Sequence, residues 1–238
     1  MLEKIYTIPI NEAFDESKAD PSCGCPFCTI SEKLGANEID LILGASMMEP
    51  DVRIKTNALG FCRAHFDRML GAKNRLGLAL MLESHLAELR SDMKDNPLTA
   101  LKPKNKGNAA VARVEKLSGT CYVCERVEAS FSKMFDNAVW LWEQDKDFRQ
   151  KFADQPYFCL PHYKRLLEVA KKELSGKTYP EFFASAEKVT MGYFDTLSED
   201  VSWFCKKFDY RYDAEPWGNA KDSPDRAVKF LCGRENGK

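Results

Sequence analysis

Apolar residues recur with a helical period along most of this chain. In residues 74–93 they are spaced three and four apart, which places them on one face of a helix. The residues on this face are Leu78, Leu82, His85 and Leu89. The same spacing predicts helices over 125–144 and 182–208 and a final helix that begins at Ser223. The pattern therefore predicts a mostly α-helical fold.

Shorter elements are predicted between these helices. Residues 4–10 alternate weakly between apolar and polar, which favours a short strand or an extended arm. Between residues 29 and 59 we expect short helices over 31–34, 37–43 and 51–59. The segment 95–108 contains three Lys, two Pro and Gly107 and has no apolar period, which is typical of a linker.

Four short cysteine motifs stand out from this pattern and form two similar sets. Each set reads Cys-x-x-Cys, a long insert, then Cys-x-x-His. The Cys-x-x-Cys pairs are offset by 96 residues and the Cys-x-x-His pairs by 97. Such a repeated plan predicts an internal duplication. The first set is Cys25, Cys28, Cys62 and His65, and the second is Cys121, Cys124, Cys159 and His162.

Each set has the ligands of one closed metal site. Cysteines two residues apart can direct both sulfurs toward one point, and a Cys and a His three apart share a face of a first helical turn. Three thiolates and one imidazole fit a tetrahedral structural Zn²⁺, so we expect two Zn²⁺ ions, one in each half. Buried cysteines without metal would not explain two sets at one offset. An iron-sulfur cluster stays open as an alternative.

The duplication predicts the domain organisation. Residues 1–94 form a first metal-binding helical repeat, 95–108 a linker and 109–176 a second repeat. Residues 177–238 form a C-terminal helical extension that packs on the repeats.

The other cysteines and the third histidine lie outside the two sets. Cys23 is interpreted as an inert neighbour of the first pair, with a spare thiol or an alternate ligand as alternatives. Cys205 is expected to be a buried, inert thiol, and no role is assigned to Cys232. His85 is interpreted as a packed core residue rather than a catalyst.

The tail segment 209–218 concentrates aromatic and turn-forming residues. We expect it to cover the helical body as a lid, with a ligand pocket as the alternative. A possible pocket would use His85, Glu215 and Trp217.

Composition limits the classes of partner and compartment. The 238 residues are 44% hydrophobic and 30% charged, which is typical of a globular protein. A net charge of −1 gives no reason to expect a nucleic-acid partner. The longest apolar run, residues 76–82, is too short to span a bilayer, and no secretion signal is recognisable. We therefore expect a cytoplasmic protein with reduced thiols and no membrane partner.

Several further motifs carry a resemblance. They are Lys-Ile-Tyr-Thr-Ile-Pro at 4–9, Cys-Pro-Phe-Cys at 25–28, Gly-Phe-Cys-x-x-His at 60–65, the Asn-Arg-Leu-Gly run at 74–82 and Glu-Pro-Trp-Gly at 215–218. With these motifs the chain resembles a bacterial family of uncharacterised function along nearly its whole length. The resemblance implies that the tail belongs to the domain, and it implies no activity.

Three functions fit these observations. The first is a zinc-stabilised interaction or ligand-binding scaffold with a protein or small-molecule partner, because no phosphate-binding loop, dinucleotide motif or His-Glu-x-x-His motif is present. The second is an iron-sulfur or thiol redox protein. The third is an enzyme with a pocket between the repeats. The sequence favours the first.

Overall fold

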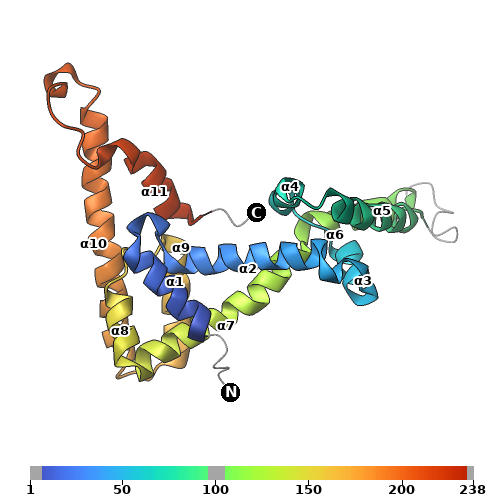
Figure 1. Ribbon diagram of the computed structural model, residues 1–238, viewed down its shortest axis with the longest axis horizontal. Coiled ribbons are helices and arrows are strands. Elements are labelled where there is room, and N and C mark those ends of the chain that lie inside the picture. The colour runs from blue at the N-terminus through green and yellow to red at the C-terminus, as the bar shows by residue number, and fades with distance from the viewer. Residues whose placement is uncertain (1–6, 96–104, 235–238) are drawn as a thin grey trace. The chain divides into compact units, whose positions relative to one another are not determined.

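The computed structural model describes residues 7–95 and 105–234, and every regular element in these ranges is a helix (Figure 1). The predicted mostly α-helical fold is therefore confirmed. The chain divides into two compact units. Among the described residues, unit 1 comprises 7–32 and 131–234, and unit 2 comprises 33–95 and 105–130.

Two helices contribute to both units. Helix α2 (Pro26–Leu43) begins in unit 1 and ends in unit 2, and α7 (Tyr122–Gln144) begins in unit 2 and ends in unit 1. The prediction of two short helices over 31–34 and 37–43 is therefore wrong, because α2 continues through Gly35. A glycine inside a helix costs about 1 kcal/mol relative to alanine. Here it leaves room for Arg68, whose Nη1 lies 2.9 Å from the position that a Cβ on Gly35 would occupy.

The unit boundaries differ from the predicted domains 1–94, 95–108, 109–176 and 177–238. They fall inside α2 and α7, at 32/33 and 130/131, and segments on both sides of the expected linker belong to unit 2. Residues 96–104 of that linker lie outside the described residues. Its flanks are tied together, because the Asp95 carboxylate accepts the backbone N–H groups of Gly107 and Ala109 at 2.6 and 3.1 Å.

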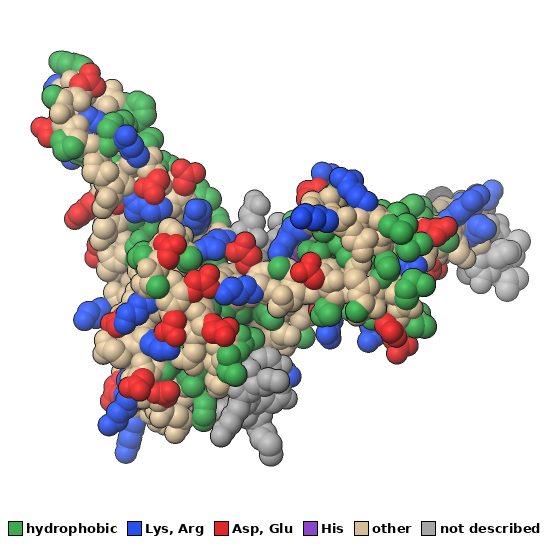
Figure 2. Space-filling model, viewed as in Figure 1, with side chains coloured by type: hydrophobic (Ala, Val, Ile, Leu, Met, Phe, Trp, Pro, Cys, Tyr) green, Lys and Arg blue, Asp and Glu red, His purple; other side chains and the backbone are tan. Residues whose placement is uncertain are grey.

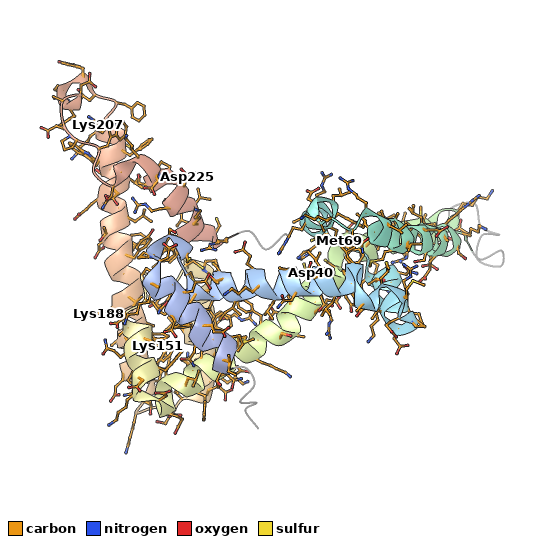
Figure 3. The ribbon with its side chains drawn as sticks, in the orientation of Figure 1. Asp40, Met69, Lys151, Lys188, Lys207 and Asp225 are labelled. Carbon is orange, nitrogen blue, oxygen red and sulfur yellow. The ribbon has the colours of Figure 1, made fainter. Side chains whose placement is uncertain are left out.

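Unit 1 is assembled around its longest helix. Helix α10 (Tyr179–Lys206) packs against α8 (Lys146–Ala153), α9 (Leu160–Glu173) and α11 (Ser223–Cys232), and α1 (Thr7–Ala19) packs on α8. Lys151 of α8, labelled in Figure 3, donates to the Asp15 carboxylate of α1 at 2.7 Å. Proline in the first turn of α9, α10 and α11 suits these helix starts, because the first N–H groups of a helix have no partner inside it.

The core of unit 1 is aromatic. Phe27 at the start of α2 stacks on Phe135 of α7 with ring centroids 4.2 Å apart, and Phe14 of α1 meets Phe27 edge to face at 5.6 Å. Trp142 contacts Phe182 of α10 at 5.1 Å. Such rings exclude water over a large area and also fix the angles at which the helices meet. The fully buried rings of this core are Phe14, Phe27, Phe135, Trp142, Phe148, Phe152, Phe158, Phe182 and Phe230.

The core of unit 2 is mostly aliphatic. It contains α3 (Pro50–Leu59), α4 (Arg63–Gly71), α5 (Arg75–Asp92) and α6 (Asn108–Gly119), together with the end of α2 and the start of α7. Met69 of α4, labelled in Figure 3, is fully buried. The buried members of this cluster are Ile39, Ile42, Leu43, Met69, Leu78, Met81, Cys121, Tyr122 and Val123.

One further prediction needs correction, and one helix was not predicted. Residues 7–10 open helix α1 rather than a strand, because Ile10 and Phe14 are buried one helical turn apart; residues 4–6 lie outside the described part. Helix α6 was not predicted. It is held by buried Arg113, whose guanidinium donates to the carbonyls of Asn57 and Ala58 at the end of α3.

The other expected helices are confirmed, with end shifts of a few residues. They are α3, α5, α7, α10 and α11. In the face shown in Figure 2, acidic and basic side chains are interspersed. Among the described helices, none has the length and apolar character needed to cross a membrane.

Candidate metal centres

All four cysteine motifs lie at helix N-termini. Cys25 and Cys121 directly precede α2 and α7, while Cys62 and Cys159 are the N-caps of α4 and α9. The second ligand of each motif then falls in the first helical turn. The partial positive charge of a helix N-terminus favours thiolates there. Each of the four motifs therefore presents two ligands from the same kind of helix start.

The structure groups these ligands differently from the predicted sets. Site 1 joins the first Cys-x-x-Cys to the second Cys-x-x-His, and site 2 joins the first Cys-x-x-His to the second Cys-x-x-Cys. Site 1 therefore lies in unit 1 and site 2 in unit 2. Site 1 is Cys25, Cys28, Cys159 and His162, and site 2 is Cys62, His65, Cys121 and Cys124.

The exchange goes with a continuous helix α2 and with a contact between the segment before Cys62 and the start of α7. The 18 residues of α2 extend about 27 Å at 1.5 Å per residue, so Leu43 is far from Cys28 when α2 ends. The carbonyl of Gly60 accepts the N–H of Tyr122 at 2.9 Å, which joins the segment before Cys62 to the start of α7. The grouping by halves was therefore wrong, although all eight residues are brought into clusters.

In site 1 the ligand atoms converge on one point. The Nδ1 of His162 lies 3.5 Å from the Sγ atoms of Cys25 and Cys28 and 3.1 Å from that of Cys159. The Sγ atoms of Cys28 and Cys159 are 3.7 Å apart.

Site 2 has nearly the same geometry. The Nδ1 of His65 lies 3.2, 3.3 and 3.4 Å from the Sγ atoms of Cys62, Cys121 and Cys124. The Cys62 and Cys124 sulfurs are 3.9 Å apart.

These distances fit one tetrahedral ion in each site. Bonds of about 2.3 Å to sulfur and about 2.0 Å to nitrogen place tetrahedral ligand atoms about 3.8 Å (sulfur to sulfur) and about 3.5 Å (sulfur to nitrogen) apart. All four ligand atoms of each site lie within 4.8 Å of one another. The donor set and its spacing therefore suit a closed four-coordinate metal ion.

The protonation of the ligands is shaped by burial. Burial raises the pKa of the Cys25 and Cys124 thiols, whereas hydrogen bonds from Cys159 and Cys25 lower the pKa of Cys28. Burial, followed by the charge of Arg68, lowers the pKa of His65, so its imidazole is neutral near pH 7. Neutral imidazole is the form that binds metal, and the protonated thiols must lose their protons when metal binds.

Aromatic rings and a distant chain segment surround site 1. The His162 ring contacts Phe27, Phe131 and Phe135 at centroid distances of 6.0, 5.3 and 5.8 Å. The backbone N–H of Arg234 donates to the Cys28 Sγ at 3.4 Å. Sequence reasoning missed this last contact, since Arg234 is 206 residues away and belongs to no motif.

Two glycines with positive φ lie just before ligand cysteines, Gly24 directly before Cys25 and Gly60 two residues before Cys62. Gly24 has φ of 69°, and a Cβ there would lie 2.5 Å from the Tyr157 hydroxyl oxygen. Gly60 has φ of 62°, and a Cβ there would lie 2.7 Å from a methyl group of Leu117. Glycine adopts this conformation without strain, so both positions admit the turn that leads into a ligand.

The remaining cysteines have different environments. Cys23 is partly exposed and its thiol donates weakly to Asp20 at 3.6 Å. Cys205 is exposed, so the expected burial is wrong: Phe204, its neighbour, packs on Trp217 while Cys205 lies on the solvent side of α10. Cys232 is also exposed.

The residues of the expected pocket belong to different parts of the chain. His85 is buried in unit 2, where burial lowers its pKa and the Asn57 backbone hydrogen-bonds it, consistent with a core residue. Glu215 and Trp217 belong to unit 1, in a loop after α10 that is tied to Lys207 through the carbonyl of Glu215 at 2.8 Å. A pocket shared by the three stays a prediction.

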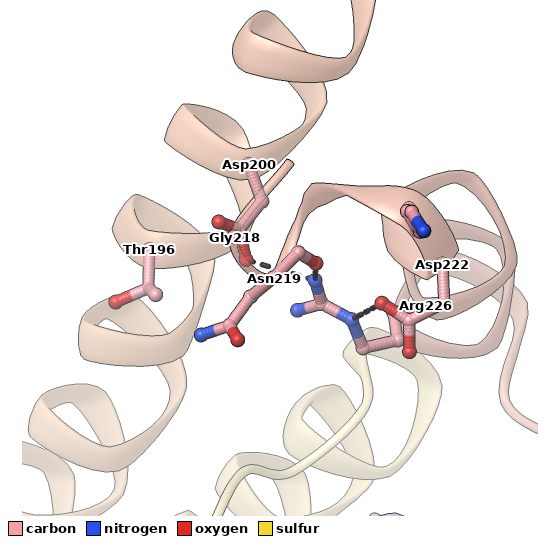
Figure 4. A pocket seen from close by; sticks show the side chains of 7 residues that line it. Thr196, Asp200, Gly218, Asn219, Asp222 and Arg226 are labelled. Atoms are coloured by element: carbon pink, nitrogen blue, oxygen red, sulfur yellow. Dashed lines mark hydrogen bonds and ion pairs between the residues drawn. The ribbon is translucent and has the colours of Figure 1, made fainter. Parts of the chain in front are cut away.

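A separate cleft of about 340 Å³ lies between α10 and the segment that leads into α11 (Figure 4). Arg226 donates within it to the carboxylates of Asp200 and Asp222 at 2.8 and 2.9 Å. Because this arginine pairs both acids, the cleft holds an internal ion-pair network. Its lining residues are Thr196, Asp200, Gly218, Asn219, Lys221, Asp222 and Arg226.

Fold and site together define a mostly α-helical protein with two Cys₃His clusters suited to metal ions. The chain belongs to the family of unknown function DUF6062, whose model matches residues 1–238. No curated protein and no solved structure matches the chain.

Proposed function

We propose that the chain binds two structural Zn²⁺ ions, one in each unit, and that the stabilised helical body serves as an interaction or ligand-binding scaffold. The observation that carries the proposal is the convergence of eight ligand atoms into two clusters of four, in each of which all atoms lie within 4.8 Å of one another. Three thiolates and an imidazole fill all four positions of such an ion, so no position is left for a substrate. Structural zinc has this closed coordination.

The spacing of the ligands favours a single ion over an iron-sulfur cluster. A cluster distributes its cysteine ligands over two or four irons. Ligands on different irons are therefore further apart than the edges of one tetrahedron. The close spacing of all four atoms in each site supports a mononuclear centre.

Metal analysis tests the proposal. The full chain should be purified without oxygen and without a metal-binding tag, and its metal content should be measured beside a visible spectrum. We expect about two zinc ions per chain and no visible absorbance. Iron with visible absorbance would contradict structural zinc and support the redox alternative, and a metal-free folded chain would contradict metal binding itself.

Exposed apolar side chains support the scaffold role. Leu76 and Leu86 of α5 are 70% and 60% exposed, and Phe208 and Tyr210 after α10 are 76% and 84% exposed. Contiguous apolar patches at the surface are enriched where proteins bind partners, so these four residues are the first positions to test. Leu86→Lys and Tyr210→Lys should each keep both metals. If the scaffold role holds, at least one should lose a partner that the wild-type chain retains after crosslinking, and retention by both would argue against these surfaces.

A further inference from the structure

The chain's last described residues lie against site 1. The backbone N–H of Arg234 points at the Cys28 Sγ, 3.4 Å away. Gly233 is equally close, since a Cβ added to it would lie 3.5 Å from the Cys159 sulfur and 3.7 Å from that of Cys28. We call Gly233 and Arg234 the strap.

The position of the strap is fixed by α11. Phe230 is 1% exposed and contacts Tyr157, Tyr193 and Phe194 at centroid distances of 5.8, 5.4 and 5.7 Å. At the C-cap, Gly233 has φ of 77°, a left-handed conformation that only glycine adopts without strain. This turn directs the backbone N–H of Arg234 at the Cys28 Sγ. The Arg234 guanidinium also reaches Glu32 on α2 at 3.1 Å.

The charge of site 1 explains why the hydrogen bond from the Arg234 N–H to the Cys28 Sγ is favourable. Three thiolates around a divalent ion leave one net negative charge in a cluster whose cysteines are almost completely buried. An N–H donor aimed at a thiolate stabilises that charge, and hydrogen bonds to charged groups are stronger than neutral ones. The backbone of the strap also covers two of the sulfurs. It therefore opposes both the escape of the metal and the attack of reagents.

We propose that the strap is a positioning element of site 1 that slows the exchange of its metal, so that retention of this metal depends on the chain's C-terminal segment. The inference rests on the proposed zinc function. It assigns a role to residues outside the ligand motifs, and it predicts that site 2 exchanges metal independently of the strap.

A pair of substitutions at one position separates the N–H from the side chain. Arg234→Pro removes both the N–H donor and the Glu32 ion pair, whereas Arg234→Ala removes only the ion pair. Zinc-loaded full chains are transferred to a colour-forming chelator, and thiol labelling mapped by mass spectrometry assigns the released metal. We expect one equivalent to leave R234P about tenfold faster than R234A, since one charged hydrogen bond is lost. Cys28 and Cys159 should become labelled, with Cys62 and Cys124 unchanged.

A second pair of substitutions tests the strap without a proline, so that the test does not depend on the folding of R234P. Gly233→Ala strains the turn beside the two sulfurs, and Gly218→Ala imposes a similar strain at φ of 54°, where a Cβ would meet nothing within 4 Å. Faster release from site 1 in G233A but not in G218A supports the strap. Equal release from both members of each pair would overturn it while the zinc function stands. A wild-type chain without metal in site 1 would overturn the zinc function and the strap together.

Discussion

Sites 1 and 2 use the same residue types at the same kind of helix start, yet they differ in how far their ligands are exposed to solvent. In site 1 the three cysteines are at most 2% exposed, and His162 lies among phenylalanine rings. In site 2 Cys62 and Cys124 are partly exposed. The ligand motif therefore sets the coordination, while the surrounding packing sets the access to it.

The two sites also close very different lengths of chain. In site 1, Cys28 and Cys159 are 131 residues apart, whereas in site 2 Cys62 and Cys124 are 62 apart. The segment closed by site 2 lies inside the one closed by site 1. The ligands of site 1 thus come from the two separate segments of unit 1. The ligands of site 2 come from the segment 33–130, of which the structure describes residues 33–95 and 105–130. Loop-closure entropy grows with loop length, although slowly.

The largest expected effect separates the observed ligand grouping from grouping by halves. Cys28→Ser with Cys62→Ser removes one ligand from each site and should abolish both metals. Cys28→Ser with Cys159→Ser removes two ligands from one site and should cost one metal. Ligation contributes on the order of 10 kcal/mol in zinc peptides, so the first double variant should unfold while the second keeps unit 2 folded.

Elemental analysis and hydrogen exchange check this prediction. The single variants Cys62→Ser and Cys159→Ser serve as controls and should each lose about one equivalent. The reverse result, with one metal lost from the Cys28/Cys62 pair and two from the Cys28/Cys159 pair, would show that each half binds its own ion.

Core substitutions should act on one unit at a time. Phe27→Ala removes a ring that packs on Phe135 and His162, and should cost about 3–5 kcal/mol and weaken metal binding at site 1. Met69→Ala in unit 2 should cost about 2–5 kcal/mol. Leu86→Ala, at an exposed position, should stay within about 0.5 kcal/mol. Denaturant unfolding with hydrogen exchange measures these values, and equal loss of protection in both units after either core change would show that they unfold together.

Acid should release metal from both sites. The pKa of Cys25 and of Cys124 is raised by burial, so these thiols bind protons readily and compete with metal as pH falls. The pKa of His65 is lowered, so this ligand stays neutral to a lower pH and does not start the release. Zinc affinity should therefore be fully present at mildly alkaline pH and fall toward pH 5. A chelator titration across this range measures it, and an affinity independent of pH would exclude thiolate ligands.

The smallest effect concerns access under native conditions. Alkylation of the zinc-loaded protein should modify exposed Cys205 and Cys232 first, because neither belongs to a site. Cys62 and Cys124 should follow, and the buried Cys25, Cys28 and Cys159 should react last. Mass spectrometry gives the order, and site 1 cysteines reacting before those of site 2 would reverse the comparison.

Much of the local structure could be predicted from the sequence, although the start of α1, the continuity of α2 and the whole of α6 could not. Periodic apolar residues predicted α5, α7 and α10, because a helix that buries one face must repeat every three to four residues. The spacing of Cys-x-x-Cys and Cys-x-x-His named all eight clustered ligands, because two ligands within four residues can meet without help from the rest of the chain. Common descent of the two halves stays a prediction.

Which motifs meet is set by the tertiary structure and not by local spacing. The same holds for the continuity of α2 through Gly35, where the penalty of one glycine, about 1 kcal/mol relative to alanine, is small compared with the packing of a whole helix. The tertiary structure likewise decided that Cys205 faces solvent and that Arg234 reaches Cys28. Contacts between distant segments depend on the paths of whole helices, and no local spacing in the sequence encodes those paths.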